Sequence, residues 1–178
     1  MPNNTTTAQK VERKYLAHYL DASFGGETAN YVRIGADLEE YEEDLSPDVE
    51  VKKNILGEQS VQHSGYEVKS EVDPYYARIG DALFERVWAN AQERKTGDDL
   101  KTTRVDVLLN TDGTVHSAYQ EDCYLIPTKV GGDTSGVQVP FTVYNAGNRK
   151  RVNWDTSTNT PSTYTASSSG GGSGNGVG

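Results

Sequence analysis

Histidine and cysteine, the residues that most often build metal sites and nucleophilic centres, are scarce in this sequence. The chain holds three histidines and one cysteine among 178 residues. His18, His63 and His116 stand far apart and match no HxxxH, HxH or CxxC spacing. The sequence therefore predicts no metal site and no bound cofactor.

The single cysteine also limits the redox chemistry of the chain. Because Cys123 has no second cysteine to pair with, the chain cannot form an internal disulfide, which favours an intracellular over a secreted origin. Asp122 lies beside it, and a neighbouring carboxylate raises the pKa of a thiol, so we expect a poor nucleophile. No GxSxG elbow surrounds any serine, and the glycine-rich residues 131–136 lack the Gly-Lys-Ser/Thr ending of a phosphate-binding loop. We expect no enzyme activity.

Apolar residues and basic residues are also few. The hydrophobic fraction is 34%, and no apolar run approaches the length that spans a bilayer, so neither a membrane partner nor a signal peptide is expected. The net charge is −9. That charge argues against a nucleic-acid-binding surface, which needs basic groups to displace counterions, but not against nucleic acid passing nearby.

The two ends of the chain are polar and poor in core-forming residues. At this length one domain is expected, and we place it at residues 14–156. Residues 1–13 are expected to form a flexible N-terminal arm. Residues 157–178, rich in Ser, Thr and Gly, are expected to form a flexible tail, because neither end can bury enough surface to offset its ordering entropy.

Residues 74–96 are predicted to form a helix. Asp73 suits the N-cap, Pro74 suits the first helical position, and Gly97 can adopt the left-handed conformation that ends a helix. Apolar residues recur at steps of three and four, which indicates one buried stripe. We expect the stripe to pack on a sheet through Tyr76, Ile79, Leu83, Phe84 and Val87.

The rest of the chain has the pattern of strands. Residues 14–21 fit a buried strand or a short helix, and we favour the strand. Residues 110–113 predict a hairpin turn and residues 120–122 a bulge. Seven or eight antiparallel strands with one helix give a mainly β fold. The other expected strands cover residues 30–35, 49–56, 61–72, 103–109, 114–126, 137–143 and 149–155.

Residues 37–48 form an unusual stretch that holds seven acids. One interpretation is a solvated acidic loop. The other is an interaction loop, because Leu38, Tyr41 and Leu45 are spaced among the acids. The sequence leaves both interpretations open.

Several short stretches follow one another in an order that resembles the major tail tube proteins of tailed bacteriophages and related prophages. The resemblance covers residues 14–155 and depends on the order of the stretches, since none is diagnostic alone. They are residues 31–35 (YVRIG), 37–41 (DLEEY), 47–50 (PDVE), 53–57 (KNILG), 65–67 (GYE), 73–78 (DPYYAR), 110–113 (NTDG), 131–136 (GGDTSG) and 140–141 (PF).

This resemblance implies an antiparallel β-sandwich or rolled barrel with a flanking helix. It implies a structural virion protein, assembled in the bacterial host cytoplasm, whose hexameric rings stack into a tube that conducts viral DNA. The partners would be further copies of the chain and other tail proteins, namely the tape measure, the tail terminator and the baseplate or tip. An acidic subunit suits such a duct, because a lumen of like charge repels phosphate.

The resemblance also implies bridging segments, for which the N-terminal segment to residue 28, residues 37–53 and the segment after residue 155 are candidates. Candidate inter-ring contacts are Leu38, Glu39, Glu40, Tyr41, Glu42, Glu43, Asp44, Leu45, Lys52 and Lys53. Candidates for a lumenal position are Glu50, Glu67, Lys69 and Asp106.

Two other functions compete with this hypothesis. The chain could be the inner tube subunit of a contractile tail or a phage-derived bacteriocin. It could instead be a small ligand-binding β-barrel, which an enclosed apolar pocket in the monomer would indicate.

Overall fold

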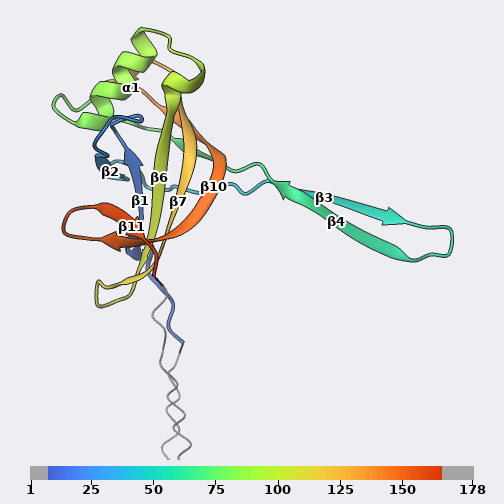
Figure 1. Cartoon of the computed structure of the whole chain (residues 1–178). Coiled ribbons are helices and arrows are strands. Elements are labelled where there is room, and N and C mark those ends of the chain that lie inside the picture. Colours follow the sequence, from blue (N-terminus) through green and yellow to red (C-terminus); the bar gives the residue numbers. More distant parts are fainter. Residues whose placement is uncertain (1–7, 166–178) are drawn as a thin grey trace, which may run out of the picture.

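The chain folds around one curled antiparallel sheet with one helix, which confirms the predicted mainly β class (Figure 1). The computed structural model describes residues 8–165. Within that range the single α-helix, α1 (Ala82–Gln92), lies at one end of the sheet. The sheet consists of β1 (Leu16–Asp21), β2 (Tyr31–Ile34), β5 (Lys69–Val72), β6 (Lys101–Leu109), β7 (Val115–Pro127), β10 (Phe141–Asp155) and β11 (Thr160–Thr163).

The strands lie in the order β11-β10-β7-β6-β1-β2, so β2 forms one edge of the sheet. The long strand β10 dominates the opposite side. Its first residues pair with β5 and its last residues pair with β11, while β7 pairs along its other side. All these pairings are antiparallel, as the short connections predict.

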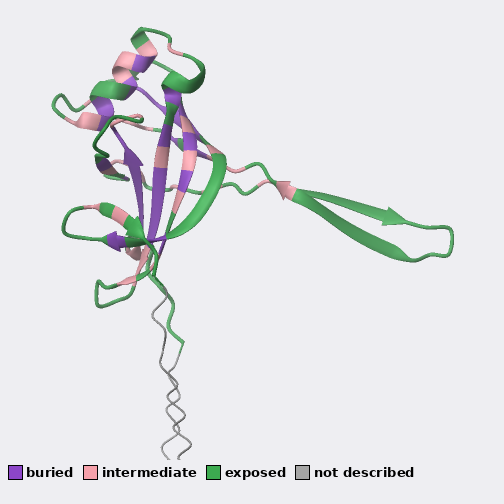
Figure 2. Ribbon diagram, in the orientation of Figure 1, coloured by how far each residue is buried: buried purple, intermediate pink, exposed green. Residues whose placement is uncertain are grey.

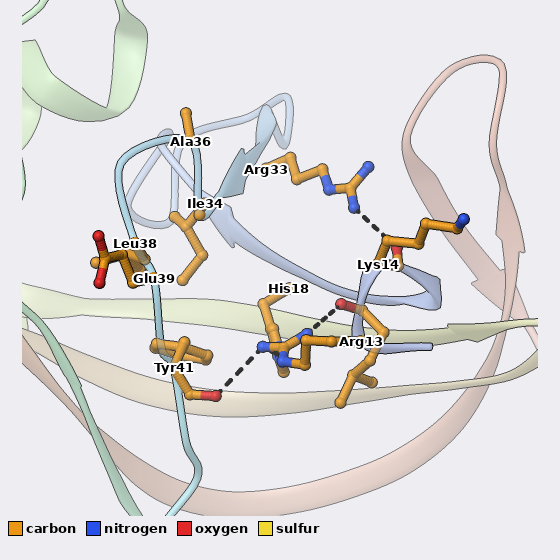
Figure 3. A pocket seen from close by; sticks show the side chains of 11 residues that line it. Arg13, Lys14, His18, Arg33, Ile34, Ala36, Leu38, Glu39 and Tyr41 are labelled. Carbon is orange, nitrogen blue, oxygen red and sulfur yellow. Dashed lines mark hydrogen bonds between the residues drawn. The ribbon is translucent and has the colours of Figure 1, made fainter. Parts of the chain in front are cut away.

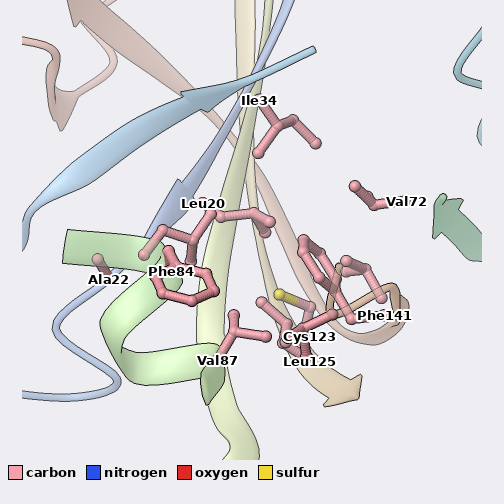
Figure 4. Packing of buried hydrophobic residues seen from close by; sticks show 12 residues of the cluster. Leu20, Ala22, Ile34, Val72, Phe84, Val87, Cys123, Leu125 and Phe141 are labelled. Carbon is pink, nitrogen blue, oxygen red and sulfur yellow. The ribbon is translucent and has the colours of Figure 1, made fainter. Parts of the chain in front are cut away.

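The larger core lies between one face of the sheet and α1 (Figure 4). Leu20 of β1, Leu125 of β7 and Phe141 of β10 meet Leu83 and Phe84 of the helix in one cluster. Burying each such side chain contributes roughly 1.5–3 kcal/mol, so this cluster fixes the helix on the sheet.

A second, smaller core lies on the other face of the sheet. Tyr19 follows its neighbour Leu20 to the opposite side, as strand alternation requires. Trp154, near the end of β10, packs 4.6 Å from the Tyr19 ring and 5.7 Å from the Tyr31 ring. Since β10 and β1 are separated by two strands, this contact shows how strongly the sheet curls.

The helix is shorter than the predicted 74–96. It begins at Ala82 because Asp81 caps it by accepting a hydrogen bond from the Phe84 amide at 2.9 Å. Gly80, at φ +91°, cannot belong to a helix. At the other end Arg94, at φ 51°, takes the left-handed conformation expected of Gly97.

Residues 75–77 form strand-like pairing instead of a first helical turn. The Ala77 amide donates to the Val137 carbonyl at 2.8 Å, and the Val139 amide donates to the Tyr75 carbonyl at 2.9 Å. The predicted packing stripe therefore divides. Leu83, Phe84 and Val87 are buried in the larger core, Tyr76 is half-buried outside the helix, and Ile79 is 95% exposed. The assignment of Ile79 to helix-on-sheet packing was wrong.

Two strand predictions also need correction. The strand predicted to end at residue 143 and the strand predicted over residues 149–155 are not separate: the chain continues through both as β10, with a bulge where Gly147 adopts φ +88°. This bulge faces Asp122 of β7, so the irregularity expected at 120–122 lies in the partner strand. The glycine-rich residues 131–136 belong to a small hairpin, β8 (Gly131–Asp133) with β9 (Gly136–Gln138).

The ordered domain extends past its predicted end at residue 156, because β11 pairs with the last residues of β10. At the N-terminal side, a 3-10 turn over Arg13–Tyr15 leads into β1, and a second one over Gly97–Leu100 leads into β6. The remainder of the predicted flexible ends, residues 1–7 and 166–178, lies outside the described residues.

One hairpin projects far from the sheet (Figure 1). It consists of β3 (Pro47–Lys53) and β4 (Gln59–Tyr66), and we call residues 47–66 the arm. Every residue of both strands is exposed except Gly65, and Figure 2 shows the arm green outside its root. The half-buried strand predicted over residues 61–72 is therefore two strands, of which only β5 joins the sheet.

Candidate functional site

A buried ion network occupies the sheet face that also carries the larger core. At its centre lies Arg104, which is 1% exposed. Its guanidinium donates to Asp106 at 2.7 Å, to Ser70 at 3.1 Å and to Asn145 at 3.2 Å. The burial of Arg104 is the largest single influence on its pKa and acts to lower it. The neighbouring charges of Asp106 and Glu43 and the hydrogen bond to Asp106 together outweigh burial, so the pKa is raised and the group stays charged.

Asp106 is the acid shared by most of the network. Its Oδ1 accepts from Arg104 and lies 2.7 Å from Nδ1 of His18. Burial opposes its ionisation, yet the hydrogen bonds from His18 and Arg104 lower the pKa of Asp106 to about 2. Asp106 is therefore a buried structural anion, and its predicted lumenal position was wrong.

The geometry also fixes the proton on His18. Nη2 of Arg13 lies 3.1 Å from Nε2 of His18, and a guanidinium can only donate. Nε2 must accept, so Nδ1 carries the proton and donates to Asp106. Arg13 also donates to the carbonyls of Leu16 and Tyr41. These two bonds connect the start of β1 with the chain around Tyr41.

Arg149, beside the bulge of β10, completes the network. It donates to Glu121 at 2.8 Å and lies 3.6 Å from both Glu43 and Asp106. Three acids thus meet two arginines and a neutral histidine in a nearly closed set of contacts. The hydroxyl of Ser70 accepts from Arg104, and the charged groups are paired mainly with one another, so the cluster acts as a structural lock.

The lock holds down part of the predicted interaction loop. We call residues 37–46 the acidic segment. Asp37 is bound by Arg78 at 2.7 Å, and Glu43 lies 3.6 Å from Arg104. Leu38 and Tyr41 pack against the larger core, and the Tyr41 ring lies edge-on to His18 at 4.6 Å.

The candidate inter-ring contacts therefore divide into two groups. Leu38, Tyr41 and Glu43 are engaged within their own subunit, and Asp44 bridges to Lys69 of β5 through backbone hydrogen bonds of 2.9 and 3.0 Å. The second group is exposed and consists of Glu39, Glu40, Glu42 and Leu45. Within the described residues, these three acids form no ion pair.

The other lumenal candidates lie outside the lock. Lys69 is half-buried in β5, and its backbone is paired on both sides. Glu67 is exposed between β4 and β5. Glu50 lies on the arm, where it pairs with Lys52 at 3.0 Å.

The arm has one apolar face and one polar face. The register places Val51 opposite Val61 and Val49 opposite His63 on one face. Glu50 and Lys52 point to the other face, as strand alternation requires. Val49, Val51 and Val61 are each about half exposed or more, and nothing within the described chain covers them.

The tip of the arm is a tightly organised turn over residues 54–58. Oδ1 of Asn54 accepts from the amides of Leu56 and Glu58, both at 3.0 Å, and Nδ2 donates to the Glu58 carboxylate at 2.6 Å. Gly57, at φ +82°, closes the turn. These bonds leave the side chains of Ile55 and Leu56 pointing into solvent, the first of them fully exposed.

A pocket of about 360 Å³ opens beside β2, at the edge of the sheet farthest from β10 (Figure 3). We call it the β2-edge pocket. Its apolar lining comes from Leu16, Ile34 and Leu38. Its charged lining comes from Arg13, Lys14, Arg33 and one acid, Glu39.

A second pocket of about 500 Å³ lies over the ion network, between Tyr41, Leu108 and Tyr119. Arg149 lines it and also lies 5.2 Å from the Tyr119 ring centre. Both pockets are open at the surface and have charged walls.

The remaining sequence candidates have structural roles. Cys123 is fully buried in the larger core, and burial, more than its acidic neighbours, raises its pKa to about 12. Within residues 8–165 no three His, Cys, Asp or Glu side chains are grouped so that they could hold a metal ion. None of the helices in that range is long and apolar enough to cross a membrane.

Sequence reasoning missed the ion network itself. Arg104 and Arg149 each lie in a strand where alternation suggests a solvent-facing polar residue. One signal was available: Arg104 and Asp106 are two residues apart in a strand, so they share a face and carry opposite charges.

Comparison with known proteins gives a likeness of fold. No protein-family model matches the chain, and no curated protein matches it. The tube-terminating cap of the anti-feeding prophage is 10% identical with a TM-score of 0.50, over 84% of this chain and 95% of that one. The sheath/tube terminator of an extracellular contractile injection system, PVC, in its extended state is 13% identical with a TM-score of 0.44, over 82% and 98%.

Proposed function

We propose that the chain is a structural subunit of a phage-tail-like particle, and that its copies assemble into hexameric rings that stack into a tube. The observation that carries this proposal is the arm. A two-stranded ribbon is marginally stable in water, and this one keeps an apolar face uncovered. A partner that covers Val49, Val51 and Val61 would remove that exposure.

The rest of the molecule is consistent with assembly as its main role. The ion network fixes the acidic segment at the root of the arm and so gives the arm a rigid base. The pockets described above are open and charged, which disfavours the alternative of a small ligand-binding β-barrel. We propose no catalytic role.

The likeness to the anti-feeding prophage cap supports the fold of such a subunit. It also favours a second candidate, a ring that ends a tube instead of building its length. In either case the expected partners are further copies of the chain and other tail proteins. For the tube-forming case we propose that viral DNA passes the lumen without specific binding, since the net charge of −9 repels phosphate. An inner tube of a contractile particle would share these features.

Electron microscopy of the purified protein over a range of concentrations tests the proposal. Tubes would support the tail tube subunit, and discrete rings that do not elongate would support the tube-ending candidate. A particle that stays monomeric at high concentration, by light scattering on the same samples, would contradict both.

The exposed part of the acidic segment is proposed to join the contact between rings. Acids on one layer can face Lys52 and Lys53 on the next, because stacked rings repeat the same geometry. Leu45, which is 50% exposed, supplies an apolar contact. Replacing Leu45 with serine should shorten the tubes without unfolding the subunit, and tubes of normal length would count against this contact.

A further inference from the structure

The tip of the arm has the properties of a preformed binding element. Asn54 organises the turn through three side-chain hydrogen bonds, so little ordering entropy remains to be lost on binding. The turn presents Ile55 and Leu56 side by side in the chain, both strongly exposed. Exposed aliphatic side chains on a rigid turn are costly in water unless a partner buries them.

The β2-edge pocket has the complementary chemistry. Its lining from Leu16, Ile34 and Leu38 suits aliphatic side chains, and its volume of about 360 Å³ lies within the range of roughly 300–1,000 Å³ that is usual for binding pockets. Figure 3 shows the side chains of Arg13, Lys14 and Arg33 around this lining.

The charges of the two elements also match. The turn over residues 54–58 carries one charged side chain, Glu58, and the exposed Lys53 directly precedes it. Around the pocket, Lys14 is already paired with Glu12 at 2.9 Å, and the two other cations, Arg13 and Arg33, outnumber the single lining acid Glu39. An acid entering beside the two aliphatic side chains therefore meets a surface of opposite sign.

The positions of tip and pocket exclude a contact within one subunit. The arm emerges next to β5, on the β10 side of the sheet, whereas the pocket lies at the β2 edge. Figure 1 shows the arm running away from the sheet on the side opposite β2. Strands of this length extend roughly 20 Å, so the tip lies beyond its own domain.

We propose that Ile55 and Leu56 of one copy insert into the β2-edge pocket of the next copy. Because tip and pocket are different surfaces at opposite sides of the subunit, the contact is heterologous and each copy offers one of each. Such a contact closes a ring or propagates a filament. This inference depends on the proposed function, since it names the partner surface of the arm in that assembly.

A photo-crosslinking amino acid at position 55 of the full chain tests the contact directly. Position 79 is the matched control, because Ile79 is also an exposed aliphatic residue but lies next to α1. In assembled protein, we expect crosslinks from position 55 to residues 13–16 and 33–41 of another copy, identified by mass spectrometry, and none there from position 79. Intact assemblies whose crosslinks map elsewhere would overturn this inference and leave the proposed function standing. Absence of any assembly would overturn both.

A charge reversal at the pocket gives a second test. Arg33→Glu removes an exposed cation whose hydrogen bond in the structure is a long one of 3.4 Å to the Lys14 carbonyl, so the fold should be retained. Arg86→Glu is the control, because Arg86 is also exposed and also donates to a backbone carbonyl. We expect a severalfold lower crosslinking yield from position 55 in Arg33→Glu and an unchanged yield in Arg86→Glu. Equal yields in the two variants would contradict the role of the pocket.

A mixing experiment tests the direction of the contact. A copy with Ile55→Ser and Leu56→Ser keeps its pocket, and a copy with Arg33→Glu keeps its tip. Each alone should elongate severalfold less than the original chain, while an equimolar mixture should form one-to-one pairs by sedimentation. A mixture that shows no pairs, or pairs formed by either variant alone, would overturn the head-to-tail arrangement.

Discussion

The acidic segment and the arm are consecutive in the chain, yet they have opposite fates. Both combine acids with a few apolar residues. Residues 37–46 fold back onto the sheet, and residues 47–66 extend into solvent. The difference lies in what the rest of the chain supplies. Arg78, Arg104 and Arg149 meet the acids of the first region, whereas the arm pairs only with itself.

The comparison shows that an acid-rich stretch is not an interaction loop or a solvated loop by composition alone. Its fate depends on cations contributed by strands distant in the sequence. The same reasoning separates residues whose loss should unfold the subunit from residues whose loss should affect assembly only.

The largest expected effect is the loss of the central cation of the ion network. Arg104→Met leaves Asp106 buried without its main partner, so the free energy of unfolding should fall by about 3–5 kcal/mol. Lys52→Met on the arm removes an exposed ion pair and should change the free energy of unfolding by less than about 0.5 kcal/mol. Urea unfolding of both variants measures the difference. A loss below about 1 kcal/mol for Arg104→Met would contradict the structural role of the network.

A smaller effect is expected for the apolar residues of the acidic segment. Tyr41→Ser removes a ring packed against His18 and the larger core, and should cost about 2 kcal/mol of stability. Leu45→Ser, at an exposed position, should cost less than about 0.5 kcal/mol. Thermal unfolding of the two variants checks this contrast. Equal losses of stability in the two variants would contradict the contrast between a packed Tyr41 and an exposed Leu45.

Acid should weaken the anchored region through Asp106. The pKa of Asp106 is about 2 in the folded chain, below its ordinary value of 3.8, so its contribution is fully present above pH 3.8 and is lost as the pH falls toward 2. The expected loss is on the order of 2 kcal/mol. Urea unfolding at several pH values measures it, with Asp106→Asn as the control that lacks this dependence. If the free energy of unfolding falls equally steeply in both proteins between pH 4 and pH 2, Asp106 is not the source of the pH dependence.

The smallest effect is expected for the exposed acids of the segment. Replacing Glu39, Glu40 and Glu42 together by glutamine should leave the free energy of unfolding within about 0.5 kcal/mol of the original, since these side chains are exposed. A larger destabilisation would show that they belong to the anchored region after all.

Much of the fold could be predicted from local pattern. Alternation located β1, β2, β6, β7 and the first part of β10, and residues 110–113 form the predicted hairpin turn, with Gly113 at φ +84°. The start of the helix was misplaced because Asp73-Pro74 carries the same capping signal as Asp81. Only the pairing of residues 75–77 with Val137 and Val139 decides between the two sites, and that pairing is a tertiary contact.

The candidate site was harder to predict, because its residues come from separate strands. Glu43, Asp106, Glu121 and Arg149 meet through sheet order and the β10 bulge, neither of which a linear pattern reveals. Alternation predicts a half-buried strand over residues 61–72, of which residues 61–66 belong to the arm, because valines alternate with polar residues in both cases. Alternation reports which residues share a face, but it does not report whether anything in the same subunit covers that face.

The measurement that bears most directly on assembly through the arm compares the full chain with a variant in which residues 47–66 are replaced by a short Gly-Ser linker. Both would be studied by sedimentation velocity and electron microscopy at matched concentrations. We predict rings or tubes from the full chain, and a folded monomer with a nearly unchanged thermal transition from the variant. Tubes of normal length from the variant without the arm would contradict the account.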